Sequence, residues 1–170
     1  GLYWALPRRA RLWLLFLASL TFYGFWRVES LPVMLLSLVT DYLVSLRLAG
    51  TTKEKSRKAL LLVSLCINLG LLFYFKYLLF FVDNVWSGLA LLGVQVTPPA
   101  LKVILPLGIS FYTFQTISYT IDVYRRQIEP VREFVLYGCY VTFFPQLVAG
   151  PILRCSEVTG QLDKRPTYRH

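Results

Sequence analysis

The sequence predicts an all-α protein built from several membrane-spanning helices, and three observations support this. Hydrophobic residues make up 56% of the 170 residues and charged residues only 16%. The mean hydropathy is +0.55, which is too high for a soluble protein of this length. The charges lie almost entirely in short connectors between apolar runs, as in proteins that cross the bilayer several times.

The first apolar runs are judged by length, because a helix needs roughly 20 residues to cross about 30 Å of hydrocarbon. Residues 12–28, 31–50 and 59–82 approach or exceed that length. Pro32 falls in the first turn of the second run, where its missing N–H group costs little. Residues 85–96 are too few to cross, and we expect them to form an interfacial helix or a packed loop.

Two later runs contain residues that disturb a helix. Residues 101–121 carry Pro106 and Gly108, so we expect the start of this span to be bent or loosened. Residues 134–153 are predicted to form a broken or re-entrant helix, because proline and glycine interrupt their second half. Backbone of that kind is tolerated at membrane depth only where protein or a wet cavity surrounds it.

Basic residues alternate between the connectors. Lys and Arg number three in residues 8–11, one in 27–30, five in 47–58, one in 83–102 and three in 122–133. Because positive charge is retained on the cytoplasmic face, the basic connectors are predicted to be cytoplasmic. Four more basic residues follow residue 153, which fits a segment that returns to the same side. We therefore predict a multi-pass protein of the inner (cytoplasmic) membrane.

The net charge of +9 results from these connectors, so the predicted partner is the lipid bilayer and not a nucleic acid. The three cysteines have no metal-ligand spacing, and we predict neither a metal site nor a bound cofactor. His170 has no acid, nucleophile or ligand at usable spacing. No residue of this chain is therefore assigned a catalytic role.

Polar residues cluster on one helix of the predicted set. Thr113, Thr116 and Thr120 project to one side of the run 101–121, with Gln115 on its flank. Two interpretations stay open at this point. The hydroxyl groups either bond neighbouring helices together or line a substrate cavity.

Two charges, Asp41 and Lys76, lie inside apolar runs. Burying Asp41 there costs about 2.5–3.5 kcal/mol on an insertion scale, so we expect a partner, either Lys76 or a group on another helix. A structural pairing is the simpler expectation. A proton or ion pathway is the alternative.

Several segments together resemble the membrane-bound O-acyltransferase family, in the bacterial branch of alginate O-acetylation and teichoic-acid D-alanyl transfer proteins. The most specific are LPLGISFYTFQ at residues 105–115, IDVYR at 121–125 and FFPQLVAGPI at 143–152. Residues 6–11, 18–23, 68–72 and 75–77 also match. The resemblance covers nearly the whole chain, so residues 1–170 are interpreted as the amino-terminal portion of one such domain.

The resemblance implies a ring of helices around a narrow tunnel and an O-acyltransferase activity. The implied donor is a cytoplasmic acyl thioester similar to acetyl-CoA, and the implied acceptor is a hydroxyl group of an extracytoplasmic polysaccharide such as alginate. An extracytoplasmic polysaccharide acetyltransferase is the implied protein partner. The family's active histidine is expected beyond His170, so this portion is expected to be inactive alone.

A passage for the acyl group would be bordered by the polar face of residues 113–120 and by the broken segment. Its cavity-lining candidates are Thr113, Gln115, Thr116, Thr120, Pro145, Gln146, Gly150 and Pro151. Two other functions stay open. A transporter or flippase would use Asp41 and Lys76 as coupling groups, and an inverted repeat, which we do not find, would support it. A non-catalytic membrane scaffold is the other alternative.

Overall fold

The computed structural model describes residues 6–91 and 105–143, and within them every regular element is helical. The elements are α2 (Arg8–Arg27), the 3-10 turn η1 (Val28–Ser30), α3 (Leu31–Gly50), α4 (Glu54–Leu72), the π-helical turn η2 (Phe73–Tyr77), α5 (Leu78–Leu91), α6 (Ile109–Tyr124) and α7 (Phe134–Thr142). Two stretches, Val28–Gly50 and Glu54–Tyr77, are long and apolar enough to cross a membrane. The all-α membrane fold is confirmed, while the individual crossings stay predictions.

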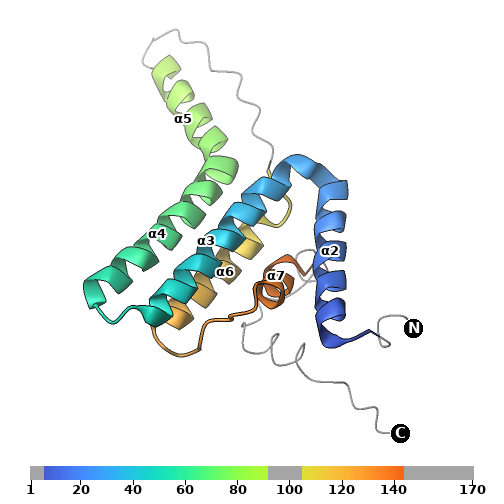
Figure 1. Cartoon of the computed structure of the whole chain (residues 1–170). Helices are drawn as coiled ribbons and strands as arrows, with labels where there is room; N and C mark the ends of the chain where they lie inside the picture. The colour runs from blue at the N-terminus through green and yellow to red at the C-terminus, as the bar shows by residue number, and fades with distance from the viewer. Residues whose placement is uncertain (1–5, 92–104, 144–170) are drawn as a thin grey trace, which may run out of the picture.

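Three helices form the body of the molecule. α3, α4 and α6 lie side by side, and each packs against the other two (Figure 1). α2 stands at a steep angle to them and packs against the short helix α7 (Figure 1). α5 continues the line of α4 and projects past the bundle (Figure 1). The polar face of α6 is thereby enclosed by α3 and α4.

The helix after residue 54 is longer than the sequence predicts. α3 covers the expected residues 31–50. After it, helical backbone runs without a break from Glu54 to Leu91. Residues 85–91 therefore continue this helix instead of starting a separate interfacial helix. Asn84 and Ser87 donate side-chain hydrogen bonds to the carbonyls of Phe80 and Asp83, one turn earlier, at 2.6 and 2.7 Å. These polar residues therefore fit within the helix, and residues 92–96 lie outside the described part.

The predicted span 101–121 begins later than expected. α6 starts at Ile109, because Gly108 adopts a left-handed backbone with φ = 68° and Pro106 precedes it. α7 ends at Thr142, three residues before Pro145. Residues 144–153 lie outside the described part, so the re-entrant segment stays a prediction.

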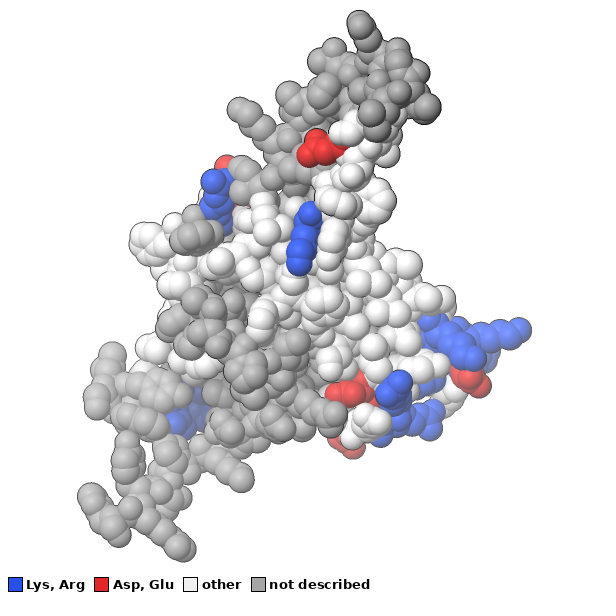
Figure 2. Space-filling view, turned by 180° about the vertical axis from the view of Figure 1, so that it is seen from behind, with Lys and Arg blue, Asp and Glu red and all other residues white. Residues whose placement is uncertain are grey.

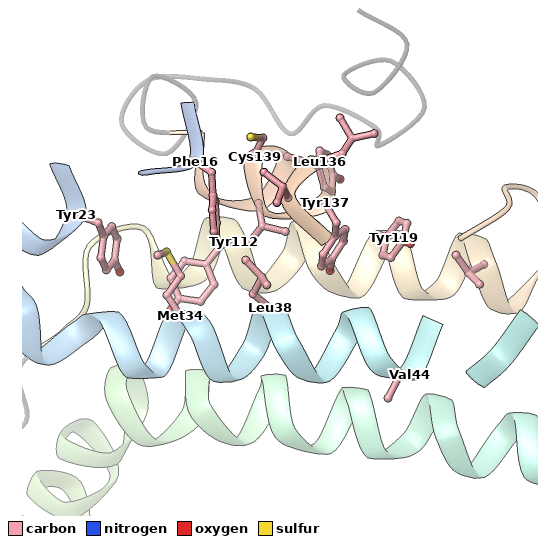
Figure 3. Close-up of a cluster of buried hydrophobic side chains, with 14 of the residues drawn as sticks. Phe16, Tyr23, Met34, Leu38, Val44, Tyr112, Tyr119, Leu136, Tyr137 and Cys139 are labelled. Atoms are coloured by element: carbon pink, nitrogen blue, oxygen red, sulfur yellow. The ribbon is translucent and has the colours of Figure 1, made fainter. Parts of the chain in front are cut away.

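Tyrosine side chains fill the space between α3, α6 and α7. Figure 3 shows Tyr137 of α7 beside Tyr119 of α6, and their ring centroids are 4.8 Å apart. Tyr140 lies 6.2 Å from Tyr137. Tyr42 of α3 packs 5.1 Å from Phe134 in an edge-on arrangement. These pairs contribute about 0.5–1.5 kcal/mol each beyond simple burial, and they give this layer a fixed geometry.

Arg57 ties together the ends of two helices. The side chain is only 6% exposed. One of its terminal nitrogens donates to the carbonyls of Leu48 and Thr51 at the end of α3. The other donates to the carbonyl of Tyr124 at the end of α6, at 2.6 Å. Because helix carboxyl ends carry unpaired carbonyls and negative partial charge, one guanidinium stabilises both.

The basic connectors meet at one end of the molecule. Arg57 joins the α3–α4 connector to the end of α6, where the α6–α7 connector begins. At the start of α2, Arg8 forms an ion pair with Glu133 at 3.3 Å. The α3–α4 and α6–α7 connectors are therefore neighbours in the fold, and an ion pair links the second of these to the start of α2.

The contact between α2 and α7 depends on the absence of a side chain at Gly138. A Cβ atom there would lie 2.6 Å from Cε2 of Phe16. The Phe16 ring is 5% exposed and is held by edge-on contacts with Trp13 and Phe134. The ring therefore cannot move away without disturbing its neighbours.

We predict that Gly138→Ala destabilises the protein by about 1–3 kcal/mol through overpacking. Gly70→Ala is the matched control, because Gly70 is helical and a Cβ there meets nothing within 4 Å. That change should stabilise the protein by about 0.5–1 kcal/mol through helix propensity. Unfolding of the detergent-purified intact protein measures both. Equal stability of the two variants would contradict the close contact.

Candidate functional site

A buried group of polar side chains lies where α3, α4 and α6 meet. We call it the polar cluster, and its members, all fully buried, are Ser37, Asp41, Ser64, Asn68 and Thr116. Two come from α3, two from α4 and one from α6. It includes one of the two intramembrane charges and one of the threonines singled out in the sequence.

Asn68 is the centre of the polar cluster. Its Nδ2 donates to Oδ2 of Asp41 at 2.8 Å and to the carbonyl of Ser64 at 3.0 Å. Its Oδ1 accepts hydrogen bonds from Ser37 and from Thr116, the latter at 3.4 Å. The hydroxyl of Ser64 donates to the other carboxylate oxygen of Asp41. One amide thus connects all three helices.

The spacing of these residues explains why they meet. Ser37 and Asp41 are four residues apart on α3, and so are Ser64 and Asn68 on α4, so each pair lies on one helix face. In lipid, a polar stripe of this kind is stabilised only when another helix covers it. Sequence reasoning missed Ser37, Ser64 and Asn68. Their four-residue spacing inside apolar runs is the signal that could have found them.

Asp41 and Lys76 have different partners in the structure. The carboxylate of Asp41 is bound by α4, which is one of the two partners that the sequence left open. The ammonium group of Lys76 lies 3.3 Å from the hydroxyl of Ser110 and 5.6 Å from the ring centroid of Tyr77. Asp41 is fully buried, whereas the side chain of Lys76 is exposed.

The predicted polar residues of α6 are buried within the protein. Thr113, Thr116 and Thr120 are at most 1% exposed. Gln115 points to α7 instead, where its Nε2 donates to the carbonyl of Tyr140 at 2.8 Å. This helix is therefore bonded to neighbours on two sides. The other cavity-lining candidates lie outside the described residues, and they are Pro145, Gln146, Gly150 and Pro151.

The apolar side of α6 is only partly free. Phe114 is 49% exposed, as expected for a residue that faces lipid, but Ile117 is buried. In the part of the chain that the structure describes, no group of three His, Cys, Asp or Glu side chains is placed to hold a metal ion. The chemistry of the polar cluster is hydrogen bonding, and its effect is to fix α6 in position.

Comparison with known proteins gives a consistent set of relatives. The chain is 38% identical over 167 residues to the probable alginate O-acetylase AlgI of Pseudomonas syringae pv. tomato, which covers 97% of this chain and 32% of the relative. It is 37% identical over 166 residues to the protein of the same name from Azotobacter vinelandii, with 97% and 33% covered. A peptidoglycan O-acetyltransferase of Helicobacter pylori is 36% identical over 190 residues, with 95% and 34% covered.

The chain spans about a third of the length of these relatives. No family model and no solved structure matches it.

We predict that Asp41→Leu destabilises the protein by about 3 kcal/mol, because the donors on Ser64 and Asn68 lose their acceptor in a buried site. Asp41→Asn keeps one acceptor oxygen and should cost less. The control is Leu43→Ala on the exposed side of the same helix, expected to cost less than about 1 kcal/mol. Unfolding in detergent measures all three. A leucine variant as stable as the native protein would contradict the role given to the polar cluster.

Proposed function

Since this chain belongs to the membrane-bound O-acyltransferase family, as its motifs predict, we propose that it forms part of an enzyme that acetylates a polysaccharide. The enzyme would transfer an acetyl group from a cytoplasmic thioester similar to acetyl-CoA to hydroxyl groups outside the cytoplasm. The observation that carries this proposal is the similarity over 97% of the chain to proteins named alginate O-acetylase. The catalytic groups, including the expected histidine, would come from the rest of the protein.

The acceptor class follows from the names of the relatives. One group is named for alginate and one protein for peptidoglycan, and both polymers carry sugar hydroxyl groups. Alginate or a similar acidic polysaccharide is our first candidate, because two alginate O-acetylases match at 38% and 37% identity, against 36% for the peptidoglycan O-acetyltransferase. A separate extracytoplasmic acetyltransferase is proposed as the partner that completes the transfer.

The membrane position supports transfer between two compartments. α3 and the helix from Glu54 to Tyr77 are long and apolar enough to cross a bilayer. The basic α3–α4 and α6–α7 connectors meet at one end of the bundle, and Arg8 is paired with Glu133 of the latter, as expected for the cytoplasmic face of a multi-pass protein in the inner membrane. A donor thioester would approach from this end. The acceptor polysaccharide would bind at the opposite end.

The described helices would form one wall of the passage. An acyl group that moves through a bilayer needs a wall that holds its shape, because small displacements of positioned groups lower rates strongly. The polar cluster fixes α6 to α3 and α4, and the hydrogen bond of Gln115 fixes α6 to α7. We assign Thr113, Thr116, Thr120 and Gln115 to this wall, and the sequence predicts that Pro145, Gln146, Gly150 and Pro151 border the same passage.

The structure gives less support to a transporter. A coupling pair would bring Asp41 and Lys76 together, but Asp41 is bonded to α4 and Lys76 to Ser110. A non-catalytic scaffold is separated from an enzyme by the following experiment.

The test is made in a strain from which the intact gene has been deleted, with ester-linked acetate on the extracellular polysaccharide as the readout. The native gene should restore acetate. Thr116→Val removes one buried hydroxyl at nearly constant volume, and we expect it to lower acetylation about tenfold by loosening α6. Phe114→Leu, on the exposed side of α6, should leave acetylation near the native level.

Immunoblots of membranes check that all variants are present in equal amounts. Failure of the native gene to restore acetate would contradict the proposed function. Native acetylation by Thr116→Val would contradict only the role of α6. Replacement of each intramembrane histidine of the intact protein distinguishes an enzyme from a scaffold, since only an enzyme would lose all activity.

A further inference from the structure

A polar pocket of about 620 Å³ opens at the end of the molecule where the basic connectors meet. We call it the arginine pocket. It is formed by the α3–α4 connector and the α6–α7 connector, and its polar lining residues include Thr51, Arg57, Arg126, Gln127, Glu129 and Arg132. Three arginines and one glutamate thus line one concave surface.

The walls of the arginine pocket are held by side chains from the helices. The backbone N–H of Val131 donates to the hydroxyl oxygen of Tyr119 at 2.9 Å. The hydroxyl of Tyr42 donates to the carbonyl of Arg132 at 2.6 Å. Arg57 fixes the opposite wall through its bonds to the ends of α3 and α6. The pocket is therefore a built feature of the fold.

The conformation of Arg126 argues that its side chain has a function. α6 ends with Gln127 N–H bonded to the carbonyl of Asp122 and Arg126 N–H bonded to that of Val123. This pattern places Arg126 in the left-handed region, with φ = 58°, where glycine is strongly favoured. Helix termination alone would therefore favour glycine at this position. An arginine brings a cation into the pocket instead.

Positively charged residues outnumber negatively charged ones in the lining of the arginine pocket. Arg126 and Arg132 are exposed, and no ion pair involves either of them within residues 6–91 and 105–143. Arg57 neutralises the partial charge of two helix ends, which would otherwise repel an anion. Glu129 is the one acidic residue in the lining. In Figure 2 the largest group of basic side chains lies at one end of the molecule, with acidic ones among them, while other basic side chains lie elsewhere on the same face.

We propose that the arginine pocket binds a phosphate-bearing anion. Guanidinium groups match phosphate oxygens in geometry and charge. The pocket lies at the ends of the proposed membrane helices, where phosphate arrives either as an acidic lipid headgroup or as part of a phosphorylated thioester donor. Only the second source rests on the proposed function.

The experiment uses the intact protein in detergent micelles and two probes, phosphatidylglycerol in a phosphatidylcholine background and free coenzyme A. The unfolding temperature is measured at increasing concentrations of each probe, and its rise gives the apparent affinity for that probe. Arg126→Gly and Arg132→Gln should each weaken binding of the relevant probe about fivefold, as expected for one lost arginine at a membrane surface. Arg125→Gln is the matched control, because this exposed residue does not line the pocket, and it should bind as the native protein does.

Stability separates binding from folding. Without ligand, Arg126→Gly should unfold at the native temperature or above it, since glycine suits the left-handed position. Glu129→Gln should bind more tightly. If the two arginine variants bind only phosphatidylglycerol more weakly, the pocket is a headgroup site. If they bind only coenzyme A more weakly, it is a donor site.

Native affinity for both probes in Arg126→Gly and Arg132→Gln would overturn the proposal. A loss of ligand-free stability in Arg126→Gly would overturn the argument from its conformation, and the affinities of Arg132→Gln and Glu129→Gln would then decide. Because no readout here depends on acetylation, failure of this proposal is distinct from failure of the proposed function.

Discussion

The hydrogen bonds around Asp41 determine how the central helices pack. A lipid environment offers no partner to a carboxylate, a hydroxyl or an amide, so these groups must find one another. Asn68 bonds to residues of α3 and α6 at once. Rotating any of the three helices about its axis would leave buried polar groups without partners, and the bundle therefore has one favoured arrangement.

The same constraint operates at the ends of the helices. Unpaired carbonyls at the ends of α3 and α6 are bound by the single guanidinium of Arg57. The α3–α4 and α6–α7 connectors are held together as a result. The hydroxyl groups of Tyr42 and Tyr119 also form hydrogen bonds with the backbone of the α6–α7 connector. The concave basic surface at this end follows from how the helices terminate, and this is why we regard it as a rigid site.

These two sets of contacts fit the requirements of acyl transfer through a membrane. A passage needs a wall that does not move and an end that attracts an anionic donor. In the proposed function, the polar cluster and the tyrosine layer would provide the first, and the arginine pocket, if it binds the donor, would provide the second. The proteins named as O-acetylases share sequence across all of these elements, since the similarity covers 97% of the chain.

The sequence alone determined the all-α membrane class, the family and the bounds of α3, because composition, motifs and a long uninterrupted apolar run are local properties. It did not determine that residues 85–91 continue the helix from Glu54 or that α6 starts only at Ile109, since these depend on side-chain bonds and on the backbone of Gly108. The partner of Asp41 was open between Lys76 and another helix, because spacing fixes the face of one helix but not which face it meets. Only tertiary packing, which brings α4 against α3 and α6, made Asn68 the shared partner and joined Arg57 to Tyr124.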